Sequence, residues 1–246
     1  MLPAHVARRR LCQRGAGMAL LLLCAAAAGT IPARAASDGP SFDCRAARSK
    51  IEKAICADPA LSALDRRIAA AYQKLLAALD APGRTALRMD QRTFLEARDI
   101  QARRSDYDLK ADLAGRAAFL ESIETAPRAG FTGTWTNVYG DVSVSTAGSG
   151  FKVEISTVQP YPSYPTCTLS ASGAVSGNTL LVGGSEEERK DNDGWTVKLT
   201  REGATLAAEL QRPREAEFGS PPFCGFRSTI DGSFFATRQP SGNPAR

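Results

Sequence analysis

Apolar residues recur every three or four positions through much of the first half of the chain, which is the spacing of one helix face. Asp58 followed by Pro59 predicts a helix start, because aspartate can cap a helix and proline is accepted at its first position. A further segment follows Ala81-Pro82-Gly83, and Asp106 is expected to cap the next one. The apolar positions of these segments are Leu61, Leu64, Ile68, Tyr72, Leu75, Leu79, Leu87, Phe94, Leu95, Ile100, Leu109, Leu113, Ala117 and Leu120.

From Gly130 onward the pattern changes to alternation of apolar and polar residues, interrupted by Gly, Ser and Asn. Alternation of this kind predicts short strands joined by turns. Even spacing of such strands favours an antiparallel β-sandwich or a small β-barrel. The predicted strands are 131–137, 141–146, 151–158, 166–172, 179–182, 195–201, 204–211, 224–229 and 233–238.

The two patterns predict an α+β protein with two domains. A helical domain is expected over 36–124 and an antiparallel β domain over 131–246. The segment 125–130 contains a proline and a glycine, as exposed linkers commonly do, and is taken as the linker.

The first 35 residues predict a secretory signal peptide. Four arginines precede an apolar run from Met18 to Ile31, and the small residues of Ala33-Arg34-Ala35 follow it. A retained membrane helix is the weaker interpretation because the run is short. Lipid attachment at Cys24 is also disfavoured, because leucine precedes that cysteine. We therefore expect a periplasmic or secreted protein without membrane insertion of the mature chain.

Removal of this leader changes the charge and the available chemistry. The formal net charge of the whole chain is +5, but residues 1–35 hold five arginines and no acid, so the mature chain is neutral. A neutral chain does not suggest nucleic-acid binding. The single histidine, His5, also lies in the leader, which excludes histidine-based catalysis and imidazole metal sites from the mature chain. We expect no catalytic residue, metal or cofactor.

Four cysteines remain after the leader, and they permit three pairings. Cys44 and Cys56 stand twelve positions apart, which in one straight helix is roughly 18 Å, too far for a disulfide. Ser49 and Glu52, however, fit a capping box, so the first helix should begin at Ser49. A loop from Cys44 can then double back over roughly 10 Å, and the bridge becomes reasonable.

The other two cysteines, Cys167 and Cys224, both lie in the predicted β domain. We expect them to form a second disulfide, which leaves one bridge in each domain. Exported proteins keep such bridges because their compartment is oxidising.

The stretch from Phe42 to Tyr72 resembles the N-terminal domain of the lysozyme inhibitor LprI family, a group of exported bacterial proteins. The resemblance covers about residues 42–120. The family's second cysteine pair is missing, because Ile100 and its neighbours include no cysteine. The matching positions are Phe42, Asp43, Cys44, Ala47, Glu52, Ile55, Cys56, Leu61, Leu64, Asp65 and Tyr72.

The resemblance implies a binding protein that occludes lysozyme-type glycan hydrolases and is not an enzyme. The alternative is a periplasmic structural or envelope-interaction module without inhibitory activity. An enzyme working with carboxylates, tyrosine or lysine alone ranks last. The oligomeric state is not indicated by any pattern in the chain.

The densest charge cluster of the β domain is the candidate contact surface for a protein partner. It is expected to be a solvated hairpin tip or a contact loop with acids at its rim and Arg189 or Lys190 as a cation that enters the target's cleft. A rival hypothesis assigns the contact to the helical domain. The candidates are Glu186, Glu187, Glu188, Arg189, Lys190 and Asp191.

Overall fold

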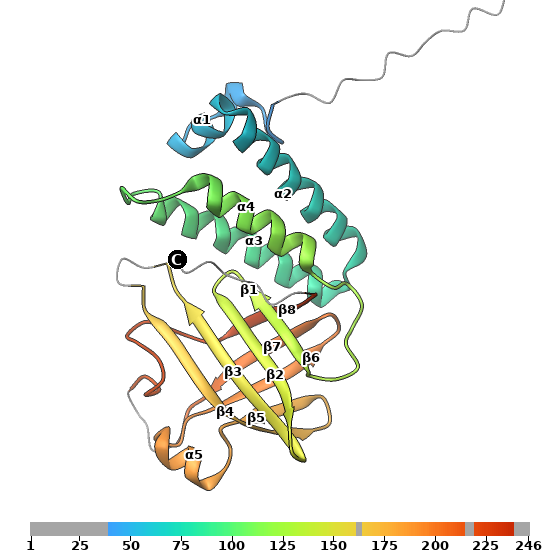
Figure 1. Cartoon of the computed structure of the whole chain (residues 1–246), viewed down its shortest axis with the longest axis vertical. Coiled ribbons are helices and arrows are strands. Elements are labelled where there is room, and N and C mark those ends of the chain that lie inside the picture. Colours follow the sequence, from blue (N-terminus) through green and yellow to red (C-terminus); the bar gives the residue numbers. More distant parts are fainter. Residues whose placement is uncertain (1–38, 161–163, 215–218, 239–246) are drawn as a thin grey trace, which may run out of the picture. The chain divides into compact units, whose positions relative to one another are not determined.

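The computed structural model describes residues 39–160, 164–214 and 219–238. Helices occupy the first part of this chain (Figure 1). The expected signal peptide over 1–35 lies outside these residues. No helix in the described ranges is long and apolar enough to cross a membrane. The helical elements are the 3-10 turn η1 (Cys44–Ala46), α1 (Lys50–Ala57), α2 (Pro59–Ala78), α3 (Ala81–Gln101) and α4 (Leu109–Ser122).

The starts of these helices follow the local capping signals. Ser49 and Glu52 form the predicted capping box of α1, and Asp58 caps α2 with Pro59 at its first position. The cap predicted for α4 is wrong by two residues. Asp108 accepts a hydrogen bond from the Ala111 amide, whereas Asp106 pairs with Arg104 at 2.7 Å.

The disulfide between Cys44 and Cys56 joins η1 to the end of α1, with the Cα atoms 5.8 Å apart. Because α1 begins after Ser49, the preceding chain turns back as the sequence predicts. Ile51 and Ile55 of the same helix are buried in the helical core. The bridge therefore ties a short helix to the segment before it.

The second part of the chain is a closed barrel of eight antiparallel strands (Figure 1). The α+β class is confirmed, and of the two expected β architectures the barrel is the one formed. Its core consists of inward-facing residues such as Trp135, Val153 and Leu199. The strands are β1 (Gly133–Asn137), β2 (Gly140–Ala147), β3 (Gly150–Val158), β4 (Thr166–Ser176), β5 (Thr179–Val182), β6 (Thr196–Glu202), β7 (Thr205–Gln211) and β8 (Gly232–Thr237).

Two segments of the barrel differ from their predicted form. The predicted strand 224–229 is a loop that makes one isolated bridge, from Cys224 to Cys167. Pairing stops there because the chain turns back at Gly225 and Ser228. The predicted hairpin tip before β6 is instead a short helix, α5 (Glu186–Asp191), because Ser185 and Glu188 form a second capping box.

The helical core includes residues from the barrel segment. In β8 the side chain of Phe234 faces the barrel interior, whereas Phe235 belongs to the helical cluster. The ring of Phe235 packs edge-on against the ring of Phe119, with the ring centroids 6.3 Å apart. The described residues of the helices and of the barrel belong to one compact unit. The domain boundary at 125–130 stays a prediction.

A buried ion pair also lies at this junction. Arg116 of α4 donates to Asp90 of α3 at 2.6 Å, and both side chains are almost inaccessible to water. The second oxygen of Asp90 accepts from the backbone amide of Val138, just after β1, at 2.8 Å. One carboxylate thus connects two helices to the barrel.

Candidate functional site

The predicted charge cluster lies in α5, which follows β5 and is drawn below the barrel strands in Figure 1. Its local fold follows from the capping box, in which Ser185 Oγ accepts from the Glu188 amide at 3.3 Å. Lys190 and Arg189 occupy the last turn, where cations complement the helix dipole. The sequence therefore builds this small helix from local signals.

Glu188 serves the fold and is not free for a partner. Its carboxylate accepts from the backbone amide and the hydroxyl of Ser172 in β4, at 2.5 and 2.8 Å, and from the Ser185 hydroxyl at 2.7 Å. Partial burial alone would raise the pKa of Glu188, but these hydrogen bonds outweigh it and lower the pKa. This side chain anchors α5 to the barrel.

The remaining charged side chains of α5 are exposed. They are Glu186, Glu187, Arg189, Lys190 and Asp191. Acids dominate the first turn, so α5 presents a mixed charge pattern with an acidic edge.

Arg189 also borders an open pocket of about 350 Å³ beside α5. Arg212 and Arg214 line the same pocket, and Arg212 stacks over the Trp195 ring at 5.5 Å. Arg189 therefore borders a concave surface, and its role as the inserted cation stays a prediction.

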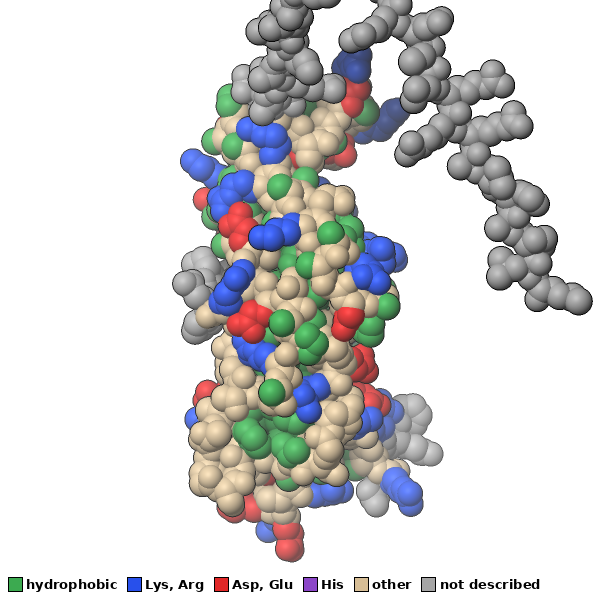
Figure 2. Space-filling view, turned by 90° about the vertical axis from the view of Figure 1, so that its right-hand side faces the viewer, with side chains coloured by type: hydrophobic (Ala, Val, Ile, Leu, Met, Phe, Trp, Pro, Cys, Tyr) green, Lys and Arg blue, Asp and Glu red, His purple; other side chains and the backbone are tan. Residues whose placement is uncertain are grey.

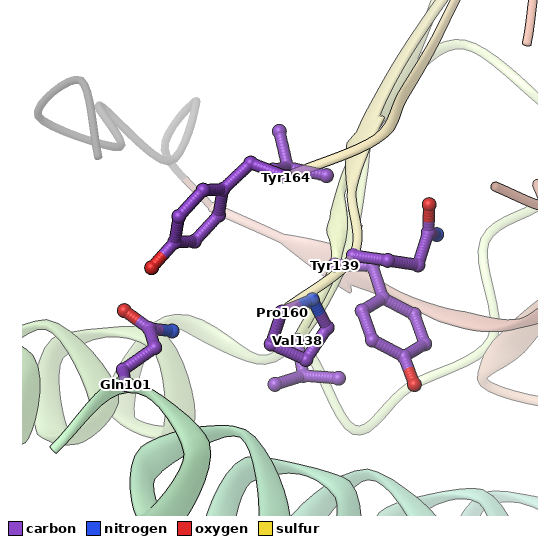
Figure 3. Close-up of a pocket in the computed structure, with 7 residues that line it drawn as sticks. Gln101, Val138, Tyr139, Pro160 and Tyr164 are labelled. Atoms are coloured by element: carbon purple, nitrogen blue, oxygen red, sulfur yellow. The ribbon is translucent and has the colours of Figure 1, made fainter. Parts of the chain in front are cut away.

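A second, much smaller pocket lies where α3 meets the barrel. Gln101, Tyr139, Gln159 and Tyr164 are among its lining residues, and Figure 3 shows the Tyr164 ring pointing toward Gln101. Its volume of about 10 Å³ is close to the minimum that one water molecule needs. This pocket has no room for an organic ligand.

The described ranges contain no cluster of three His, Cys, Asp or Glu residues placed to hold a metal ion. On the face displayed in Figure 2, Lys and Arg side chains are interspersed with Asp and Glu side chains. A partner that binds this face would therefore meet charges of both signs and no broad patch of one sign.

The alternation of residues predicts a strand at 224–229, where the structure has a turn. The structure places Phe226 and Arg227 at the exposed tip of a turn there. The signal that could have revealed the turn is the combination of Pro221-Pro222 before Cys224 and Gly225 after it, since such residues punctuate chains at turns.

The second disulfide joins Cys167 at the start of β4 to Cys224 in this loop. Both predicted bridges are thus present. Disulfides persist mainly in oxidising compartments. Together with the comparison below, they indicate an extracytoplasmic protein.

Comparison with known proteins gives one family match. Residues 44–138 match the model of the family described as lysozyme inhibitor LprI. No curated protein and no solved structure matches the chain. The matched range extends beyond the resemblance seen in the sequence, through β1 to Val138, the residue whose amide is bound by Asp90. Residues 44–138 are thus similar to the lysozyme inhibitor LprI family, which confirms the resemblance found in the sequence.

Proposed function

We propose that this protein is exported to the periplasm or beyond, where it binds lysozyme-type glycan hydrolases and inhibits them by covering the substrate cleft. The observation that carries the proposal is the family match over residues 44–138. The family's description names an inhibitor and no catalytic activity, which favours a binding protein over an enzyme.

Inhibition by occlusion requires a surface and no reactive group. Glycan hydrolases of this kind cut between two carboxyl groups, one of which acts as an acid while the other is ionised. A protein seated over these groups excludes the glycan. A cation facing the ionised carboxylate adds affinity, and acids at the rim attract a basic enzyme.

The exposed acids of α5 are the proposed rim. Glu186, Glu187 and Asp191 are exposed on α5, while the carboxylate of Glu188 is hydrogen-bonded within the protein. Rim charges act over distance and mainly change the association rate. Their contribution should therefore fall as salt is added.

The test is inhibition of a basic lysozyme by the mature chain with its disulfides intact. Association and dissociation rates are measured at low and high salt, alongside hydrolysis of bacterial cell walls. The triple variant Glu186→Gln, Glu187→Gln, Asp191→Asn should associate about tenfold more slowly at low salt and dissociate at the normal rate. Lys110→Ala, an exposed charge on α4, is the matched control and should change neither rate.

The alternative, an envelope-interaction module, predicts another result. In that case the chain would be retained by cell-wall material and would slow none of several lysozymes tested. That outcome would overturn the inhibitor proposal.

A further inference from the structure

We propose that the turn Gly225–Ser228, whose base is fixed to the barrel by the Cys167–Cys224 disulfide, is the element that enters the hydrolase cleft, with Arg227 facing the catalytic carboxylate. This inference deepens the proposed function and rests on it. It assigns the inserted cation to Arg227 and not to Arg189 or Lys190 of α5.

The exposure of Phe226 is the first observation. Its side chain is the most exposed large apolar residue of the described ranges, at 80%, compared with 55% for Met89 and 40% for Leu95. Arg227 lies over its ring at 5.5 Å and is also exposed. Aromatic residues and arginine are the types that most often carry binding energy at protein interfaces.

The backbone of the turn is the second observation. The Ser228 amide donates to the Gly225 carbonyl at 3.0 Å, so Phe226 and Arg227 are the two central residues of a turn. The φ angle is +65° at Arg227 and is not positive at Phe226, which is the pattern of a type II turn. That position favours glycine, so an arginine there carries a backbone cost that local packing does not explain.

The base of the turn is held firmly on both sides. Besides the disulfide, the Gly225 amide donates to the Thr166 carbonyl at 2.8 Å, and the Thr168 amide donates to the Phe223 carbonyl at 2.9 Å. On the other side, the buried Gln159 side chain donates to the Thr229 carbonyl at 2.9 Å. A loop fixed before binding loses little conformational freedom on binding, which favours affinity.

The charge of the loop indicates its partner. Among residues 219–230, Arg227 is the only charged side chain and no acid is present. A lone guanidinium at a tip suits a site with a carboxylate, which it can bind through two parallel hydrogen bonds. The adjacent Phe226 ring suits the apolar faces of a site that binds sugar rings. A lysozyme-type cleft offers both features.

The experiment compares variants of the intact mature chain against a basic lysozyme. Arg227→Gly removes the cation but suits the positive φ, so the thermal midpoint should be unchanged or raised. Its dissociation should be about thirtyfold faster, as for a hot-spot residue, with inhibition weakened equally. Phe226→Ala should act similarly, and Arg227→Lys should give an intermediate value because it keeps the charge without the planar fork.

Matched controls separate this loop from other surfaces. Met89→Ala removes another exposed apolar side chain, and Arg103→Ala removes another exposed arginine. Both should inhibit like the unmodified chain. The pair Arg189→Ala, Lys190→Ala should also leave the dissociation rate within about twofold of normal, since rim charges act mainly on association.

A competition measurement tests the cleft directly. A chitin oligosaccharide that saturates the lysozyme cleft should block association of the unmodified chain. Normal inhibition by Arg227→Gly and Phe226→Ala would overturn the loop assignment while the proposed function stands. Binding that the oligosaccharide does not affect would overturn both the loop assignment and the proposed covering of the cleft. If the unmodified chain inhibits no lysozyme, both fail together.

Discussion

The helical region and the barrel obtain their cores in different ways. The barrel closes on side chains of its own segment, from Phe131 to Ala236. The helices complete their core with residues of the barrel, including Ala204 and Phe235. The difference indicates that the barrel can support its own packing, whereas the helices depend on a surface that the barrel supplies.

The family match fits this asymmetry. It covers the helices and continues through β1 to Val138, the residue whose amide Asp90 binds. The exposed features with candidate binding chemistry, α5 and the turn at Phe226, lie outside the matched range. The region that matches the family model and the surfaces proposed to contact a partner are therefore different parts of the molecule.

Two consecutive phenylalanines of β8 offer the strongest test of the comparison. Phe234→Ala and Phe235→Ala each remove a fully buried ring and should each cost about 3–5 kcal/mol of unfolding free energy. Phe235→Ala should lower hydrogen-exchange protection in the helices more than in the barrel, because the ring contacts the helical cluster. Phe234→Ala should do the reverse. Unchanged helical protection in Phe235→Ala would favour a helical domain that is independent of the barrel, divided from it at 125–130.

The buried ion pair gives an effect of similar size. Arg116→Ala leaves the Asp90 carboxylate buried without its cation and should cost about 3–5 kcal/mol in urea unfolding. Arg67→Ala is the control, because it breaks an exposed pair with Glu121 that has a similar distance of 2.7 Å. That change should cost less than about 1 kcal/mol. Equal losses would show that the buried pair stabilises the protein no more than an exposed one does.

Removal of each disulfide should affect the regions unequally. The bridge Cys167–Cys224 closes a separation of 57 residues and Cys44–Cys56 one of 12. The loop-entropy relation gives about 4 kcal/mol for the first and about 3 kcal/mol for the second. Paired serine variants, unfolded in urea without reductant, will measure both. If removal of Cys44–Cys56 lowered the free energy of unfolding more than removal of Cys167–Cys224, the helical region would depend on its disulfide more than chain entropy explains.

The two capping boxes should give the smallest effects. Ser49→Ala and Ser185→Ala should each lower the free energy of unfolding by about 1 kcal/mol, and urea unfolding followed by far-ultraviolet circular dichroism will measure the loss.

The glutamates of the two capping boxes predict a pH dependence of stability. Hydrogen bonds from the Ser49 and Arg48 amides lower the pKa of Glu52 below its usual 4.5. Although its partial burial opposes them, the hydrogen bonds that Glu188 accepts likewise lower the pKa of Glu188.

Because both pKa values are lower in the folded chain, their stabilisation is present above about pH 4.5 and is lost as the pH falls through the folded values. Glu52→Gln and Glu188→Gln should each flatten the decline of stability between pH 5 and 3. A decline as steep as that of the unmodified chain would contradict these assignments.

Elements that are marked by a few neighbouring residues were predicted correctly from the sequence. Ser49 with Glu52 located the first helix and allowed the Cys44–Cys56 bridge, because capping depends on neighbours three positions apart. Alternation located eight strands, since a half-buried strand shows a period of two. Ser185 with Glu188 is the same kind of local signal, and it marks the start of α5.

Contacts between distant residues were decided only by the tertiary structure. Closure of the barrel depends on β1 pairing with β8, about a hundred residues apart, and no local pattern states which strands meet. The pairing of Asp90 with Arg116 and Val138 is likewise invisible in the sequence. The segment after Cys224 became a turn because the disulfide and a single bridge hold it at the barrel edge, where further pairing stops. Local propensity acts over a few residues, whereas burial and long-range pairing depend on the whole folded chain.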